Sequence, residues 1–124
     1  MIGIDIIKTS RMQKMIDRFG DRALQKFLHV EEIALVKNYK TAAGFWATKE
    51  AFSKAIGTGI GVQCSFFDMK IYKTPQGAPQ LALSQKVIEK FSIKNVALSI
   101  THDGEYAISV VEVQSTTTNK VKQF

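Results

Sequence analysis

Two hydrophobic periodicities divide the chain, and their order limits the folds that it can adopt. In the first half, apolar residues recur at helical spacing, as they do between Met12 and Phe19. In the second half they alternate, as between Ser65 and Lys73, which is typical of half-buried strands. Residues 2–7 also alternate and precede the helices. This order predicts an α+β fold, in which N-terminal helices pack on an antiparallel sheet that the first strand joins.

The expected elements follow from these periods and from the residues that begin and end them. Helices are expected at 10–19, 21–28, 31–39, 42–56 and 85–91, and strands at 2–7, 65–73, 80–83, 95–101 and 106–113. Ser10, Thr41 and Ser84 are the predicted N-caps, and Gly20 and Gly57 the predicted C-terminal stops. A chain of 124 residues is expected to form a single domain, here residues 1–114, with a polar, frayed tail at 115–124.

The net charge and the cysteine content limit the cellular compartments and the binding partners that we expect. The net charge of +6 favours an anionic partner, although it also serves solubility. Cys64 is the only cysteine, so no internal disulfide can form, which fits a reducing compartment. No apolar run approaches the ~20 residues of a membrane span, and the N-terminus lacks the basic region of a signal peptide. We therefore expect a cytoplasmic protein without a membrane partner.

The stretch TKEAFSKAIGTGIG (48–61) combines charged residues with glycines. Glu50 and Lys54 are spaced for a helical surface ion pair of about 0.3–0.5 kcal/mol, or they could line a binding site. The glycines could simply end the helix, or they could bring backbone N–H groups close to phosphate oxygens. The order of a P-loop is absent. Taken alone, these residues leave both interpretations open.

Two residues elsewhere in the chain bear on this choice. Asp5 interrupts a strand of isoleucines, where a carboxylate needs solvent, a basic side chain or a metal as compensation. His102 ends a strand, where it is either solvated or placed to reach a cleft. Mg²⁺ typically binds one or two carboxylates together with substrate phosphates, and Asp5 with Glu50 would supply them. A pair of carboxylates that binds Mg²⁺ in this way indicates a protein that transfers or cleaves a phosphate ester.

Segments spread over most of the chain carry a resemblance to a known family. They are GIDII (3–7), FWATKEAFSKAIGTGIG (45–61), FFDMKI (66–71), QGAPQL (76–81) and LSITHDGEYAISVV (98–111). The chain resembles holo-acyl-carrier-protein synthase, the small type of 4′-phosphopantetheinyl transferase. The resemblance implies Mg²⁺-dependent transfer of the phosphopantetheine arm of coenzyme A to a serine of apo acyl carrier protein, which releases adenosine 3′,5′-bisphosphate and serves fatty acid biosynthesis. It also implies a homotrimer with coenzyme A in clefts between protomers.

The resemblance also implies roles for individual residues. Asp5 and Glu50 are the expected Mg²⁺ ligands, and Lys54 and His102 complete the expected catalytic set. The residues expected to contact coenzyme A are Lys49, Ser53, Lys54, Gly57, Gly59, Pro79 and His102. Either Glu50 or a metal-bound water could take the proton of the serine.

One departure from the family pattern concerns a basic contact with coenzyme A. Family members often carry an arginine where this chain has Phe45. The resemblance therefore leaves one expected cation unaccounted for, and Lys40 or Lys49 is the expected substitute.

The basic side of the first helix points to a protein partner. Arg11, Lys14 and Arg18 lie on its expected exposed side, and acyl carrier proteins are acidic, so this side is the predicted docking face. The alternative function is a small basic nucleic-acid-binding module, which would explain the charge. It would not explain Asp5 and Glu50, because carboxylates repel phosphates unless a metal intervenes. A non-catalytic interaction subunit with the same fold is a further alternative.

Overall fold

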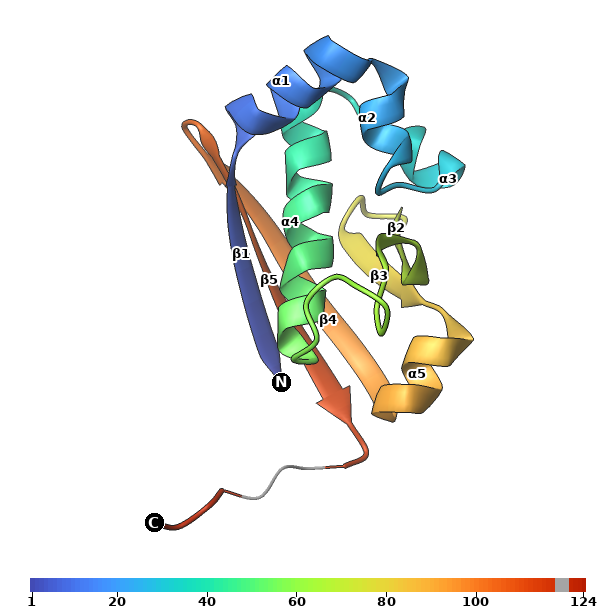
Figure 1. The fold of residues 1–124 in the computed structure, drawn as a ribbon, viewed down its shortest axis with the longest axis vertical. Coiled ribbons are helices and arrows are strands. Elements are labelled where there is room, and N and C mark those ends of the chain that lie inside the picture. The colour runs from blue at the N-terminus through green and yellow to red at the C-terminus, as the bar shows by residue number, and fades with distance from the viewer. Residues whose placement is uncertain (118–120) are drawn as a thin grey trace.

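The computed structural model describes residues 1–117 and 121–124, and its elements follow the predicted order (Figure 1). They are β1 (Ile2–Lys8), α1 (Thr9–Phe19), α2 (Asp21–Gln25), α3 (Val30–Ile33), α4 (Tyr39–Ala55), β2 (Met69–Lys73), β3 (Pro79–Leu83), α5 (Gln85–Phe91), β4 (Ile93–Asp103) and β5 (Tyr106–Ser115). Part of the predicted tail, residues 118–120, lies outside the described residues, and the domain boundary after residue 114 stays a prediction. No helix in the described ranges is long and apolar enough to cross a bilayer.

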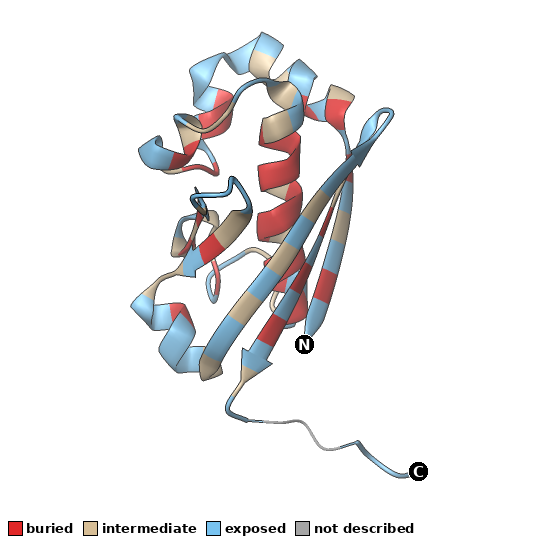
Figure 2. Cartoon of the chain, turned by 180° about the vertical axis from the view of Figure 1, so that it is seen from behind, coloured by how far each residue is buried: buried red, intermediate tan, exposed pale blue. Residues whose placement is uncertain are grey.

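The sheet is antiparallel, with β5 between β1 and β4. The prediction that the first strand joins it is confirmed, because all of β1 pairs with β5. The hairpin of β2 and β3 forms a separate two-stranded sheet, which differs from the expected single sheet. Helix α4 crosses the inner face of the three-stranded sheet, and the buried residues gather between the two (Figure 2). The α+β architecture is therefore as predicted.

The contact between β1 and α4 is closest at Gly3. A Cβ atom at this residue would lie only 1.8 Å from the carbonyl oxygen of Ala51 and 2.6 Å from the amide nitrogen of Ala55. Glycine is thus required here by space. The small side chains of Ala51 and Ala55 serve the same approach, so that the strand backbone lies directly on the helix.

Several helix ends agree with the sequence prediction. Ser84 caps α5 through its side chain, which accepts from the backbone N–H of Val87. Gly20 and Gly57 follow α1 and α4 with φ values of 59° and 83°, a region that glycine adopts without strain.

Other helix ends differ. Helix α1 begins at Thr9 rather than at the predicted cap Ser10, and the Thr9 hydroxyl donates to the carbonyl of Glu105 across 3.1 Å. Asn38, not Thr41, caps α4, because its side-chain oxygen accepts from the N–H groups of Lys40 and Thr41. The helix expected at 31–39 is not continuous: α3 ends at Ile33, and the extended Asn38 separates it from α4, which begins at Tyr39.

A fully buried ion pair holds the short helices and the hairpin against α4. The Lys49 ammonium donates to Glu32 Oε1 across 2.8 Å, and both side chains are 0% exposed. The two Glu32 oxygens also accept from the N–H groups of His29 and Ile71. Burial lowers the pKa of Lys49, and the Glu32 carboxylate opposes this shift. The pair therefore connects α3, α4 and β2 within the core.

Breaking this pair is expected to destabilise the fold strongly. Lys49→Met leaves the Glu32 charge buried without a counter-ion, so we expect a loss of about 3–5 kcal/mol in the free energy of unfolding, measured by urea denaturation. The double variant Glu32→Met/Lys49→Met removes both charges and should recover most of that loss. A single-variant loss below about 1 kcal/mol would show that the pair does not hold these segments.

Candidate functional site

Asp5, Glu50 and Lys54 come together where β1 crosses α4. Asp5 lies two residues beyond Gly3, on the same face of the strand, and therefore points toward the helix. Lys54 donates to Asp5 Oδ1 across 2.8 Å and to the carbonyl of Ile4 across 3.2 Å. The ion pair thus joins helix to strand, and Lys54 does not form the helical pair with Glu50 that their spacing allows. A carboxylate in a strand of isoleucines is compensated by a lysine from the neighbouring helix.

Glu50 completes this carboxylate cluster. Partial burial and the nearby Asp5 charge raise the pKa of Glu50, and the Lys54 charge offsets part of that shift. Two carboxylates share one ammonium here, so the cluster favours an added cation. The described residues contain no group of three or more metal-type ligands. Two carboxylates fit Mg²⁺ that draws its remaining ligands from water and substrate phosphates.

A groove of about 510 Å³ lies on the other side of α4, between this helix, the end of β4 and the β2–β3 hairpin. Its walls include two of the predicted residues, His102 and Pro79. The other residues that line it are Ala34, Leu35, Lys37, Thr41, Gly44, Phe45, Lys73, Gly77 and Ile100. An apolar floor with three basic side chains, Lys37, Lys73 and His102, suits a ligand that joins an apolar ring to anionic groups.

The predicted catalytic residues therefore form two groups in one chain. Asp5 lies on β1 and His102 on β4, and these are the opposite edge strands of the sheet, with β5 between them. The carboxylate cluster lies at the β1 side of α4, whereas the groove lies at the β4 side. The sequence placed all of these residues in a single site but could not indicate this separation.

Two residues expected to contact coenzyme A are instead buried. Lys49 is 0% exposed, and its ammonium donates to Glu32 and to the carbonyls of Phe27 and Phe66. An ammonium has three hydrogens, so none remains for a ligand. The Ser53 hydroxyl is also buried and donates to the carbonyl of Glu50 across 2.7 Å. This geometry argues against the expected contacts of both residues, and against Lys49 as the substitute cation.

The glycine loop after α4 also differs from its expected use. The Gly57 N–H donates to the carbonyl of Lys54, and the Gly59 N–H donates to the carbonyl of Ser53. Both glycines have positive φ values, 83° and 67°. The loop therefore uses glycine for its backbone path, and its N–H groups at these two positions are already satisfied. A ligand could approach this surface closely, but not through these two donors.

Gly44, Lys37 and Lys73 line the groove but were not predicted from the sequence. Gly44 carried a detectable signal, because glycine is unfavourable inside a helix and here follows two alanines. Lys37 and Lys73 carried none, since an exposed lysine in a loop or strand is common. Phe45, which replaces the arginine often found there, has its ring in the core at 2% exposure.

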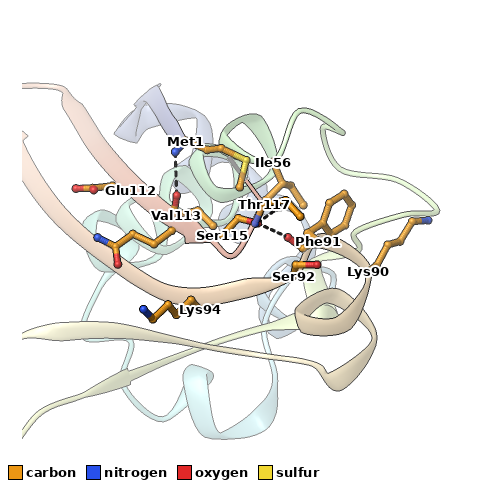
Figure 3. Close-up of a pocket in the computed structure, with 11 residues that line it drawn as sticks. Met1, Ile56, Lys90, Phe91, Ser92, Lys94, Glu112, Val113, Ser115 and Thr117 are labelled. Atoms are coloured by element: carbon orange, nitrogen blue, oxygen red, sulfur yellow. Dashed lines mark hydrogen bonds between the residues drawn. The ribbon is translucent and has the colours of Figure 1, made fainter. Parts of the chain in front are cut away.

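A larger cavity, of about 800 Å³, lies between Met1, Ile56 after α4, and the junction of α5 with β4 (Figure 3). It is lined in part by Met1, Phe91 and Lys94, and contains none of the predicted site residues. The N-terminal ammonium at its edge donates to the carbonyl of Val113 across 2.8 Å. This cavity is separate from both the carboxylate cluster and the groove.

The sequence of this chain matches known proteins over most of its length. Residues 1–111 match the model of the 4′-phosphopantetheinyl transferase superfamily. A holo-[acyl-carrier-protein] synthase of Sulfurimonas denitrificans is 59% identical over 121 residues, which cover 98% of this chain and 100% of that protein. One from Aliarcobacter butzleri is 56% identical over 111 residues, 90% of this chain and 94% of that protein.

Solved structures agree. The holo-[acyl-carrier-protein] synthase of Helicobacter pylori, in complex with coenzyme A, has a TM-score of 0.89 and 44% identity, and covers 92% of this chain and 100% of its own. The corresponding Bacillus anthracis structure has a TM-score of 0.78 and 36% identity, with coverage of 93% and 96%. The chain therefore belongs to the 4′-phosphopantetheinyl transferase superfamily, among the holo-acyl-carrier-protein synthases that its motifs predicted.

Proposed function

We propose that the chain transfers the 4′-phosphopantetheine group of coenzyme A to a serine of apo acyl carrier protein, as its family does, and releases adenosine 3′,5′-bisphosphate. The observation that carries the proposal is the cluster of Asp5, Glu50 and Lys54, with its 2.8 Å ion pair. Two carboxylates beside one lysine suit a metal-bound diphosphate and argue against the alternative of a nucleic-acid-binding module. The proposed setting is the cytoplasm.

The chemistry is a displacement at phosphorus. The serine oxygen forms a bond to the phosphorus that carries the pantetheine arm, and the bond from that phosphorus to the oxygen bridging toward adenosine breaks. Such reactions depend mainly on alignment and on neutralised charge. In the proposed site Asp5 and Glu50 would hold Mg²⁺, which supplies Lewis-acid stabilisation when bound. Lys54 would then contact a phosphate oxygen, and the serine proton would leave through Glu50 or through solvent.

Loss of either carboxylate is expected to abolish transfer. Asp5→Asn and Glu50→Gln should each lower the rate by on the order of 10²–10³-fold, because each removes a carboxylate that would hold the Mg²⁺ that neutralises the reacting phosphate. The measurement is mass spectrometry of apo acyl carrier protein after incubation with coenzyme A and Mg²⁺. Melting with and without Mg²⁺ gives a second readout, in which only the unmodified protein should be stabilised.

Glu89→Gln is the matched control, because Glu89 is an exposed carboxylate on α5 whose charge faces solvent. It should leave transfer unchanged. Near-normal activity of both Asp5→Asn and Glu50→Gln would refute the metal assignment. No transfer by the unmodified protein would refute the proposed function itself.

We further propose that the active unit is a homotrimer in which two copies complete each site. The outer face of the sheet supports association, because Ile2, Ile4 and Ile6 are 71%, 59% and 56% exposed. In the strand register Ile4 lies opposite Val110, which is also exposed, and Ile6 lies opposite Ile108. An apolar row of this kind on a monomer is typical of an interaction surface. Association would also allow the carboxylate cluster of one copy to meet the groove of the next.

A charge in this row should separate the copies. Val110→Glu places a carboxylate at the centre of the outer face, so we expect a monomer by light scattering after gel filtration, with transfer activity lost at the same protein concentration. Gln114→Glu adds the same charge at the exposed, polar end of β5 and should leave the assembly intact. A monomeric but fully active Val110→Glu variant would show that one chain completes the site.

We also propose that α1 is the docking face for the acidic carrier protein. Arg11, Lys14 and Arg18 are all exposed on this helix, at the end of the molecule opposite α5 (Figure 1). Charges at such a surface act mainly on the rate of association, which falls as salt rises.

Charge reversal on this helix should therefore affect one substrate only. Arg18→Glu is expected to raise the KM for apo acyl carrier protein several-fold and to weaken its salt dependence, with the KM for coenzyme A unchanged. Steady-state kinetics with each substrate varied in turn at two salt concentrations make the test. Equal effects on both substrates would contradict a docking role for α1.

A further inference from the structure

Gly44 occupies a position in α4 where the backbone does not require glycine. It lies inside the helix, and its φ is outside the positive region that favours glycine. Glycine is the least favourable helix residue apart from proline. What requires it is space, because a Cβ atom would lie 3.0 Å from Ile100 Cγ2 and 3.3 Å from His102 Nε2. The missing side chain lets β4 approach the helix at the residue that carries the imidazole.

The imidazole of His102 uses this space to reach the helix backbone. Its Nε2 lies 2.9 Å from the carbonyl oxygen of Lys40. A carbonyl only accepts, so Nε2 carries the hydrogen and donates it. The Lys40 carbonyl lies one helical turn before Gly44, and a side chain at that position would lie beside it.

The next turn of α4 shows how a side chain can bind the helix carbonyl four residues before it. Thr48 stands four residues after Gly44, and its hydroxyl donates to the Gly44 carbonyl across 2.9 Å. At the preceding carbonyl, that of Lys40, no side chain from residue 44 competes, and the imidazole of His102 donates instead. The two turns differ in whether the helix itself or β4 supplies the donor.

We propose that Gly44 is a positioning residue for His102. Because Gly44 has no side chain, the imidazole can donate to the Lys40 carbonyl, and this hydrogen bond fixes the hydrogen on Nε2. Nδ1 is then the ring nitrogen available to a ligand in the groove. Nδ1 makes no hydrogen bond within residues 1–117 and 121–124. The groove that His102 lines also contains Lys73 and Pro79. The proposal rests on the proposed function in that it takes the groove ligand to be coenzyme A.

The tautomer can be measured directly, without a variant. In nitrogen NMR of the unmodified protein in alkaline buffer, where an imidazole is neutral, His102 should show a protonated Nε2 and an unprotonated Nδ1. A hydrogen on Nδ1 would overturn the proposal, whatever the activity of the protein. Gly44→Ser provides a competing hydroxyl for the Lys40 carbonyl, as Thr48 does one turn later, and should mix the two tautomers. Lys40→Ala keeps the carbonyl and should leave the tautomer unchanged.

Kinetics separate positioning from helix packing. Gly44→Ala should lower kcat/KM for coenzyme A about 10-fold, mainly through KM, because the imidazole is displaced from its seat. In a His102→Ala background the same substitution should have a much smaller effect, limited to the contact with Ile100 Cγ2, since its action on the kinetics passes through the ring. Independent, multiplying losses would overturn the proposal, as would an unchanged tautomer in Gly44→Ser. Absence of transfer by the unmodified protein would refute the proposed function. The NMR result would still decide which ring nitrogen of His102 carries the hydrogen.

Discussion

The contact between the backbones of β1 and α4 at Gly3 determines how the proposed site is assembled. With no side chain at Gly3, the strand lies directly on the helix beside Ala51 and Ala55. Asp5 follows on the same face of the strand and therefore meets Lys54 and Glu50 without crossing a layer of side chains. A larger residue at position 3 would overlap the Ala51 carbonyl oxygen and force strand and helix apart, which would pull Asp5 away from Lys54.

Two lysines of α4 show how the same residue type serves two purposes on one helix. Lys49 and Lys54 are five residues apart, which places them roughly 140° apart around the helix axis. Lys49 points into the core, where Glu32 and two backbone carbonyls satisfy its ammonium. Lys54 points to β1 and keeps half of its side chain in solvent. The first holds the hairpin and short helices in place, and the second stays partly exposed beside Asp5, as the proposed phosphate contact requires.

Much of the fold could be predicted from the sequence because its signals are local. The alternation of residues 2–7, the cap Ser84 and the stops Gly20 and Gly57 all act within a few residues, and all were confirmed. The errors arose where several local signals compete. Both Thr41 and Asn38 suit a helix start, and Asn38 prevails because its extended backbone and its side chain together satisfy two N–H groups. The alternation of residues 65–73 likewise does not show that β2 pairs only with β3.

The sequence by itself determined the family and the kinds of chemistry available. The motifs around Asp5, Glu50 and His102 can be recognised from the order of residues alone, without knowledge of any contact. Only the tertiary structure decided which side chains are available. It buried Lys49 and Ser53, satisfied the N–H groups of two loop glycines, and separated His102 from the carboxylate cluster by the width of the sheet. The physical reason is that spacing along a chain fixes the direction of a side chain relative to its own element, whereas burial and partners depend on which other element packs against it.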